Sequence, residues 1–415
     1  MRKNNCLTII LLMIGYYVHS QTIRLEDILK SVEDNHPQLK MFDADIRSMD
    51  AAAEGAKSWM PPEFSTGFWM MPYNPSFWKK QDMGTGMGQY MIGMQQMLPN
   101  KKRQQAESAY MKSMSAVEKE NRNASLNELK ANARTAYANW VMQVKRLVVL
   151  KENEKLLDFM IRNAEIRYKN NMGKLNAYYK AKAALGDLKL MQEMEASEIE
   201  MQRIRLSSLM NFPISQHAMP DTNFQIQPAS TSIDSSLLAS ARSDIRAIEK
   251  QKQINILQQQ VESSKLKPEF GLKYDHMFGF GGLPQQFNLM AMIRIPMASW
   301  SSKMNKANIE SLKYKNESLE QQRKMMLNEL TGMALEMQQQ ITAKRRQLDL
   351  YQTSVIPALR NNYQSMLMAY EQNTEELFML YDAWESLNMM QLKFLEEEGL
   401  LYQLNIQQQR ILENR

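Results

Sequence analysis

The sequence predicts a mainly α-helical fold with a small β part, built by internal duplication. Most of the chain is polar and has the spacing of long helices, while two pairs of short segments alternate between apolar and polar residues as strands do. Similar segments also follow each other in the same order in both halves. "YKNNMGKLNAYYKAKAAL" (168–185) resembles "YEQNTEELFMLYDAWESL" (370–387) at an offset of 202 residues, and "PPEFSTGF" (61–68) resembles "KPEFGLKY" (267–274).

The first twenty residues have the pattern of a secretory signal peptide. Arg2 and Lys3 precede an apolar stretch, and Val18 and Ser20 are small residues at the positions that signal peptidase recognises. We therefore expect a signal peptide over residues 1–20. After it, no apolar run is long enough to cross a membrane as a helix.

Cysteine usage and charge exclude several classes of site. Cys6 is the only cysteine, so the mature chain would have neither a disulfide nor a thiolate metal site. It precedes the apolar stretch of the signal, where it is poorly placed for lipidation. The net charge is +6 and the mean hydropathy is −0.50. In an exported protein we interpret the basic excess as solvated helix surface and expect no nucleic-acid partner.

The duplication divides the chain into two structural repeats, expected at 21–212 and 237–415, with a Pro- and Ser-rich connector or equatorial segment at 213–236. Each repeat should contain a helix, a β-hairpin, a long helix and a shorter helix. The first repeat should have a helix at about 23–60, a β-hairpin at 63–98 and helices at about 101–168 and 174–210. The second should have a helix before a β-hairpin at 269–296, then a long helix at 299–371 and a final helix.

In each repeat the two shorter helices, placed end to end, match the long one, which spans roughly 100 Å at about 1.5 Å per residue. This predicts a long antiparallel coiled coil with a β-hairpin at one end and a tight turn at the other. An apolar seam at coiled-coil spacing, with one stutter, supports the prediction. The seam consists of Leu126, Leu129, Ala133, Ala136, Trp140, Val144 and Leu147.

Each predicted strand has one apolar, aromatic face and one polar face. The apolar faces consist of Phe64, Thr66, Phe68, Met70, Tyr90, Ile92, Met94, Leu98, Phe270, Leu272, Tyr274, His276, Phe278, Phe287, Leu289, Ala291, Ile293 and Ile295. Segments of about ten residues suffice to cross a bilayer as tilted strands, although a soluble half-buried sheet shows the same alternation.

Two hairpins cannot close a membrane barrel alone, because an open edge leaves backbone groups unpaired in lipid. Four transmembrane strands per protomer must therefore be completed by other copies, and three copies would give a twelve-stranded β-barrel. The coiled-coil helices would then enclose a tunnel, an α-barrel that continues the β-barrel.

The duplicated plan resembles the TolC-like outer-membrane efflux factors, including their heavy-metal branch, over nearly all of residues 22–412. "MIGMQQMLPNKKR" (91–103) resembles the family's passage from strand through proline into the long helix. "RYKNNMGKL" (167–175) resembles its Tyr…Gly turn at the helix tip, and "YEQNTEELFMLYDA" (370–383) occupies the equivalent place with Glu375 where the family has glycine.

The resemblance implies a homotrimer with its barrel in the cell outer membrane and its helical tunnel in the periplasm. It implies partners as well: outer-membrane lipid, a periplasmic adaptor (membrane fusion) protein and an inner-membrane pump. The chain would be a passive conduit without enzymatic activity or cofactor. Some metal-efflux members are lipidated at the mature N-terminus, a feature that this chain lacks.

The tip turns are the candidate channel entrance. Converging helices would gather the acidic side chains of the second turn around a threefold axis, and such a carboxylate ring selects cations. The candidate residues are Asn170, Asn171, Gly173, Leu175, Asn373, Thr374, Glu375, Glu376 and Asp382. The alternative is an ordinary helix start, where glutamate is favoured by the helix dipole.

Methionines on the polar strand faces are candidate contacts for copper or silver ions, because thioethers are soft ligands. They are Met91, Met97, Met277, Met290 and Met292. The alternative is flexible packing, since the chain has 36 methionines, many of them on helices. No metal site of ordinary ligand spacing and no catalytic motif is present in the sequence. A secreted coiled-coil scaffold and a channel for protein secretion remain the alternative functions.

Overall fold

The computed structural model describes residues 22–80, 82, 84–170, 175–224 and 234–413. The expected signal peptide, with Cys6, lies outside the described residues. The chain divides into two units that are interleaved in sequence. The sheet unit comprises residues 41–123 and 243–327, and the turn unit comprises the chain up to residue 40 together with 124–242 and 328–415. The division into two sequential repeats stays a prediction.

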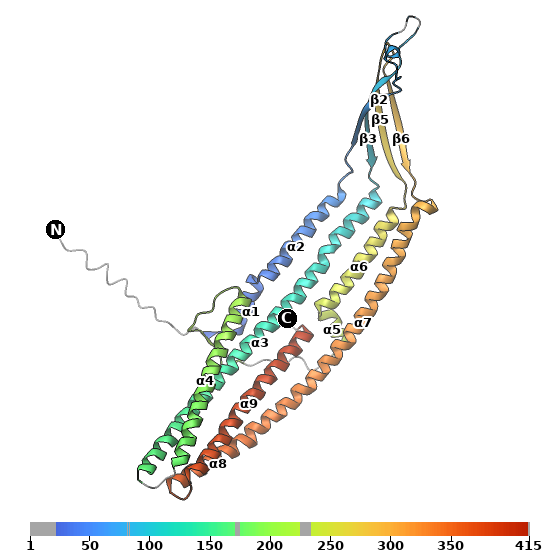
Figure 1. The fold of residues 1–415 in the computed structure, drawn as a ribbon. Helices are drawn as coiled ribbons and strands as arrows, with labels where there is room; N and C mark the ends of the chain where they lie inside the picture. The colour runs from blue at the N-terminus through green and yellow to red at the C-terminus, as the bar shows by residue number, and fades with distance from the viewer. Residues whose placement is uncertain (1–21, 81, 83, 171–174, 225–233, 414–415) are drawn as a thin grey trace, which may run out of the picture. The chain divides into compact units, whose positions relative to one another are not determined.

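The sheet unit contains one antiparallel sheet with the strand order β2-β3-β5-β6 (Figure 1). Its strands are β2 (Glu63–Trp69), β3 (Gln89–Leu98), β5 (Glu269–Gly279) and β6 (Gln286–Arg294). Both predicted hairpins are confirmed. They join through β3 and β5, which come from different halves of the chain and pair over the whole length of β3.

The apolar face of this sheet is exposed, whereas the polar face of its central strands is covered. On β5, Phe270 and Leu272 are 54% and 49% exposed, but Asp275 and Met277 are only 2% and 6% exposed. The register extends the alternation across the strands, since Met94 lies opposite Tyr274. A half-buried sheet in water shows the reverse arrangement, with its apolar face packed against a core. The predicted faces are therefore confirmed, and the outer one is apolar.

The two hairpin loops at the far end of the sheet form hydrogen bonds with each other. The backbone N–H of Gly86 donates to the carbonyl of Gly281 at 2.7 Å, and Phe280 donates to Gly88 at 3.0 Å. A Cβ at Gly86 would lie 2.8 Å from the Cα of Gly281, and Gly281 has a φ of +60°. Only glycine allows this approach, which holds the two hairpin loops together.

Helices of the sheet unit begin directly after the strands. Pro99 cannot donate to the strand ladder and ends β3, and Asn100 caps α3 (Lys101–Lys169). The Asn100 Oδ1 accepts hydrogen bonds from the backbone N–H groups of Lys102 and Arg103 at 3.0 and 3.4 Å. The predicted strand–proline–helix passage is thus confirmed.

Polar contacts join α6 (Ser243–Ser264) to α7 (Ser299–Leu350) in the sheet unit. Lys252 lies 2.7 Å from Glu320 on α7, and Asn255 Nδ2 donates to Asn316 Oδ1 at 2.8 Å. Arg122 on α3 likewise lies 2.6 Å from Asp43 on α2 (Pro37–Glu54). These directed polar contacts fix the alignment of the paired helices.

The turn unit has its first core where α1 (Leu25–Asn35) and α4 (Leu175–Met210) pack on α3. Six residues of the predicted seam belong to this core. Leu129, Ala133, Ala136 and Trp140 are buried and Leu126 and Val144 pack against them, whereas Leu147 is only half-buried.

Tyr137, in the same core, holds the short parallel pair of β1 (Thr22–Ile23) and β4 (Met219–Pro220). Its hydroxyl donates to the carbonyl of Ile23 and accepts from the backbone N–H of Asp221, both at 2.9 Å. Burial raises the pKa of Tyr137 to about 12, so the hydroxyl keeps its proton and its donor role.

A second core of the turn unit lies where α3 and α4 meet α8 (Ile356–Glu371) and α9 (Leu377–Leu412). Trp384 and Asn153 form a hydrogen-bond network within this core. The indole Nε1 of Trp384 donates to Asn153 Oδ1 at 2.9 Å, and Asn153 Nδ2 donates to Gln391 Oε1 at 3.2 Å. This network ties α3 to α9 inside an apolar environment.

Three predicted helices are wrong as single elements. The helix at 23–60 is broken at His36, because Pro37 begins α2, and it ends in a 3-10 turn at Gly55–Lys57. The helix ahead of the second β-hairpin is divided at Arg242 into α5 (Ser235–Ala241) and α6. The helix at 299–371 contains a π-helical turn at Tyr351–Val355.

The π-helical turn ends two residues before Pro357, which lacks the N–H that a regular helix needs there. α8 therefore continues after a local change in the hydrogen-bond pattern. Across the described residues, none of the helices combines the length and apolar character that a membrane span requires.

Candidate functional site

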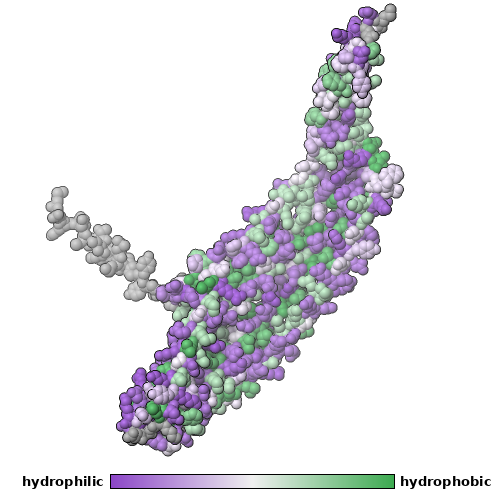
Figure 2. Space-filling view, in the orientation of Figure 1, coloured by the Kyte–Doolittle hydropathy of each residue, from purple (hydrophilic) through white to green (hydrophobic). Residues whose placement is uncertain are grey.

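The two tip turns of the turn unit lie between α3 and α4 and between α8 and α9 (Figure 1). Asn170 follows the last residue of α3, and Leu175 begins α4. Asn171 and Gly173 lie outside the described residues. In Figure 2, mostly hydrophilic residues surround this end of the helices. The second predicted turn is therefore at its predicted place in the chain, and the first lies mostly outside the described residues.

The second tip turn depends on Asn373. This residue has a φ of +60°, in the left-handed region that asparagine tolerates better than most residues. The backbone N–H and the Oγ1 of Thr374 both donate to the carbonyl of Ala369, at 2.9 and 3.0 Å. Because the left-handed position falls at 373, the turn needs no glycine at Glu375.

The acidic residues of this turn are exposed at the start of α9. Glu375 and Glu376 precede the first residue of α9, and Asp382 lies on the exposed side of its second turn. All three side chains can face water or a lumen. Their placement at a helix N-terminus also fits the helix-dipole explanation, so their role as a gate stays a proposal.

Three cation–π contacts from two basic residues join the tip turns, and sequence reasoning missed all of them. The Arg167 guanidinium on α3 lies 3.9 Å from the ring centre of Tyr370 on α8 and also donates to the Tyr370 carbonyl. Lys180 Nζ on α4 lies 4.1 Å from the ring of Phe378 and 4.3 Å from that of Tyr381, both on α9. These contacts thus connect the two helical hairpins through aromatic rings that are buried or half-buried.

The tyrosines at the tip are held in their neutral form. Burial, followed by the charge of nearby Glu385, raises the pKa of Tyr381 to about 12. Burial also raises the pKa of Tyr370, against the opposing effect of Arg167. Both rings therefore keep the neutral aromatic character that the cation–π contacts use at any physiological pH.

The polar face of the sheet is the second candidate surface, and four of the five predicted methionines lie there in two groups. Met91 is the cross-strand partner of Met277. Met97 and Met292 meet over Gly271, since a Cβ on that glycine would lie 2.6 Å from Met97 Sδ and 3.0 Å from Met292 Cε. Met290 pairs with Lys273 and stands apart from both groups.

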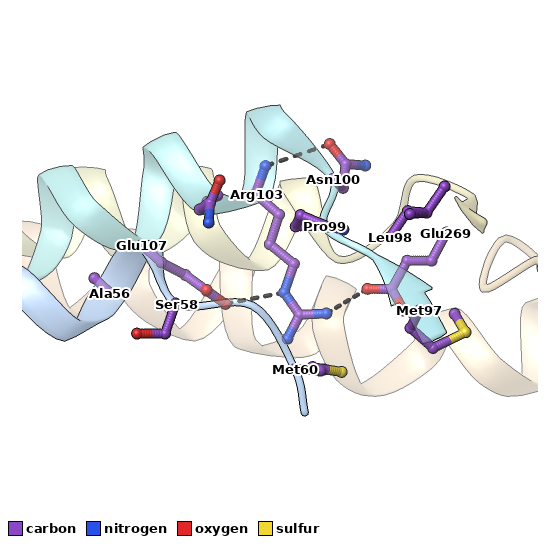
Figure 3. A pocket seen from close by; sticks show the side chains of 11 residues that line it. Ala56, Ser58, Met60, Met97, Leu98, Pro99, Asn100, Arg103, Glu107 and Glu269 are labelled. Atoms are coloured by element: carbon purple, nitrogen blue, oxygen red, sulfur yellow. Dashed lines mark hydrogen bonds and ion pairs between the residues drawn. The ribbon is translucent and has the colours of Figure 1, made fainter. Parts of the chain in front are cut away.

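The base of the sheet carries a small pocket lined by Arg103, Glu107 and Glu269 (Figure 3). Arg103 Nε lies 2.9 Å from Glu107 Oε1, and its Nη1 forms an ion pair with Glu269 on β5. Arg294 on β6 lies 3.2 Å from the other oxygen of Glu269. Burial lowers the pKa of Arg103, but the bonds to Glu107 and Glu269 outweigh burial and raise it.

Metal-ligand geometry of the ordinary kind is absent from the described part of the chain. No three His, Cys, Asp or Glu side chains gather there closely enough to hold an ion. The methionine groups contain no such residues among their thioethers, so they would suit only a soft ion.

Comparisons with known proteins identify the fold. No protein-family model and no curated protein matches the sequence. Among solved structures, the chain is similar to CusC, which undergoes transmembrane channel formation, with 14% identity over 94% of this chain and 91% of that one and a TM-score of 0.74. The outer membrane protein VceC of Vibrio cholerae has 15% identity over 94% and 95%, with a TM-score of 0.70.

The open state of the Neisseria gonorrhoeae MtrE outer membrane channel is also similar, with 15% identity over 94% of this chain and 88% of that one and a TM-score of 0.73. The chain has the TolC-like fold. The predicted fold class, long helical hairpins with four strands per protomer, is confirmed, as is the resemblance drawn from the motifs at 91–103 and 167–175.

Within the TolC-like fold, the two candidate surfaces belong to different units. The tip turns close the helical hairpins of the turn unit, and the methionines line one face of the sheet.

Proposed function

We propose that the protein is the outer-membrane channel of a tripartite efflux system and acts as a passive homotrimeric conduit from the periplasm to the outside. The observation that carries this proposal is the outward apolar face of the sheet. Phe64, Phe68 and Leu289 are 73%, 67% and 67% exposed, a pattern that is stable in hydrocarbon and costly in water.

Aromatic rings near the loop end of the sheet support membrane insertion. Phe68 and Tyr90 have ring centres 5.6 Å apart, and Tyr90 and Phe278 have centres 6.4 Å apart, all on the outward face. Aromatic residues commonly form a belt at the membrane interface of outer-membrane barrels.

The open edges of the sheet support assembly from several copies. β2 and β6 are the two edge strands, and their unpaired backbone groups would cost several kcal/mol each in lipid. Three chains would pair these edges into a closed barrel of twelve strands. The helices would then surround a tunnel in the periplasm, whose tip turns contact an adaptor protein and an inner-membrane pump.

A conduit of this kind has no reaction to catalyse. The proposal assigns the energy of transport to the partner pump, and it assigns the acidic residues Glu375, Glu376 and Asp382 to the entrance. Asn170, Leu175, Asn373 and Thr374 belong to the same proposed entrance, and Asn171 and Gly173 lie outside the described residues. The protein would be neither an enzyme nor a cofactor carrier.

Fractionation and bilayer recording test the proposal. The full chain, expressed in a Gram-negative host, should sediment with outer membranes, run as a trimer after detergent extraction and give ion conductance in planar bilayers. A water-soluble monomer in the culture medium would instead support a secreted coiled-coil scaffold. A conducting trimer whose loss abolishes export of a protein would support the secretion alternative.

The methionine groups favour copper or silver ions as cargo over drugs. Met91 with Met277, and Met97 with Met292, present thioethers in pairs on the face that would line the pore. Methionine as flexible packing is the competing explanation, since Met142, Met160 and Met210 are buried in the helical cores.

Metal tolerance of a deletion strain distinguishes these explanations. Loss of the protein should lower silver and copper tolerance, and the double variant Met97→Leu with Met292→Leu, which keeps side-chain volume and removes sulfur, should not restore it fully. Unchanged metal tolerance with lost drug tolerance would contradict the soft-ion cargo.

A further inference from the structure

One cross-strand row on the polar face of the sheet contains only oxygen-bearing side chains and a glycine. Ser65 on β2 lies opposite Gly93 on β3, Gly93 lies opposite Asp275 on β5, and Asp275 lies opposite Asn288 on β6. The rows on either side contain methionines. This row therefore carries a carboxylate, an amide and a hydroxyl and no methionine.

Gly93 leaves a space that its neighbours fill. The position of a Cβ on Gly93 is approached by Asp275 Oδ1 from one side and by Ser65 Oγ from the other, more closely than real Cβ atoms allow. The side chains of Ser65 and Asp275 thus converge over this glycine, which any larger residue would prevent.

Asp275 is buried, and one of its oxygens has no partner. The residue is 2% exposed, and Oδ1 makes no hydrogen bond, although it is covered. Oδ2 lies 3.2 Å from Nζ of Lys273, two residues away on the same face. A covered carboxylate oxygen without a donor is costly unless it serves a ligand or a changing environment. The convergence over Gly93 directs this oxygen towards the polar face.

We propose that Asp275 is the cation-selecting residue of the barrel, an inference that rests on the proposed function as a trimeric channel. In the closed barrel, three copies of the row place three carboxylates at one level of the pore. Each carboxylate, although covered, adds a negative charge to the polar face and so attracts small hydrated cations in transit. This filter lies in the membrane part and is separate from the acidic tip turn.

Lys273 limits the strength of this filter. Its ammonium group neutralises part of each Asp275 charge and would itself attract anions. The two residues therefore act in opposite directions on ion selectivity. An ion pair with a purely structural role would not shift selectivity in this way. Removing Asp275 should favour anions, and removing Lys273 should favour cations.

Reversal potentials across a KCl gradient in planar bilayers test the inference with the full-length trimer. Asp275→Asn should lower the permeability ratio of potassium to chloride by about threefold, the order expected for one lost charge per subunit in a water-filled pore. Lys273→Gln should raise the ratio. Asp27→Asn, the same change at an exposed position on α1, should leave it as in the unsubstituted protein.

The outcomes separate this inference from the proposed function. Absence of conductance in the unsubstituted protein would overturn both. A conducting channel in which Asp275→Asn keeps the original reversal potential would overturn the Asp275 filter alone. If Asp275→Asn fails to assemble, Lys273→Gln decides: a raised ratio supports the filter, and an unchanged one overturns it.

Discussion

Arg103 and Glu269 form an ion pair that connects the first turn of α3 to the first residue of β5 (Figure 3). The two residues come from different halves of the chain and meet where the sheet passes into the helices. Arg294 holds the second oxygen of Glu269, so the carboxylate lies between two guanidinium groups. The junction is thus fixed by charge at a place where backbone pairing ends.

Arg103→Gln should loosen this junction. The variant loses the contacts to Glu107 and Glu269 and leaves Glu269, which is 12% exposed at its side chain, with one partner instead of two. We expect a loss of about 2 kcal/mol in the free energy of unfolding. Urea unfolding of the detergent-solubilised protein, followed by circular dichroism, measures it. Lys102→Ala, at the exposed neighbouring position, is the control and should change little.

Asn153→Ala should destabilise the second core of the turn unit. Asn153 is 2% exposed, and its loss leaves the indole N–H of Trp384 buried without an acceptor. A cost of about 2–3 kcal/mol follows from the unmade hydrogen bond and the small cavity. The same unfolding experiment applies, with Met389→Ala on the exposed side of α9 as control. Equal stability of the two variants would contradict a structural role for the network.

Arg167→Ala should weaken the contact between the two tip turns. The arginine loses both the ring of Tyr370 and its carbonyl, together worth about 1–2 kcal/mol. If the tips restrict the entrance, single-channel recordings should show larger or more frequent openings. Arg162→Ala, at an exposed position on the same helix, should conduct like the unsubstituted protein.

The double variant Glu375→Ala with Glu376→Ala tests the acidic entrance. Removing two exposed carboxylates per subunit should reduce the preference for cations without a loss of stability, because neither side chain is in a core. Conductance and reversal potential of the reconstituted channel are the measurements. Unchanged selectivity would leave only the helix-dipole role for these residues.

Glu320 should make the stability of the sheet unit depend on acid. Hydrogen bonds from Arg323 and then Lys252 lower its pKa from 4.5 to about 2. Its contribution is therefore present above pH 4.5 and is lost as the pH falls through about 2. Glu320→Gln should flatten the fall of the unfolding midpoint between these values, and Arg323→Gln should flatten it partly. Parallel pH curves for all three proteins would contradict this assignment.

The strands and their faces could be predicted because their period of two is local. Phe270 and Leu272 alternate with Lys273 and Asp275 within a few residues, and no distant contact is needed to see it. The break at Pro37 and the π-helical turn before Pro357 also had local signals, since proline interrupts a regular helix. The residues on both sides of each proline have helical spacing, and for this reason the sequence predicted a continuous helix at both places.

The contacts that join distant segments could not be predicted. Arg167 and Tyr370 are 203 residues apart, and nothing in either neighbourhood indicates the other. The convergence of Ser65 and Asp275 over Gly93 needs the register of three strands from both halves. Glu375 stands where a glycine is expected in the turn, and only the structure shows that Asn373 takes the left-handed position instead.

Two glycines on the polar face, Gly93 and Gly271, help to specify the register between β3 and β5. Each receives bulky neighbours: Asp275 and Ser65 at one, Met97 and Met292 at the other. A slip by one residue would turn Lys273 and Asp275 towards hydrocarbon and would place side chains where both gaps now lie. In the proposed membrane trimer, a misaligned chain would therefore be disfavoured both by burial of charge in lipid and by steric clash at the two glycines.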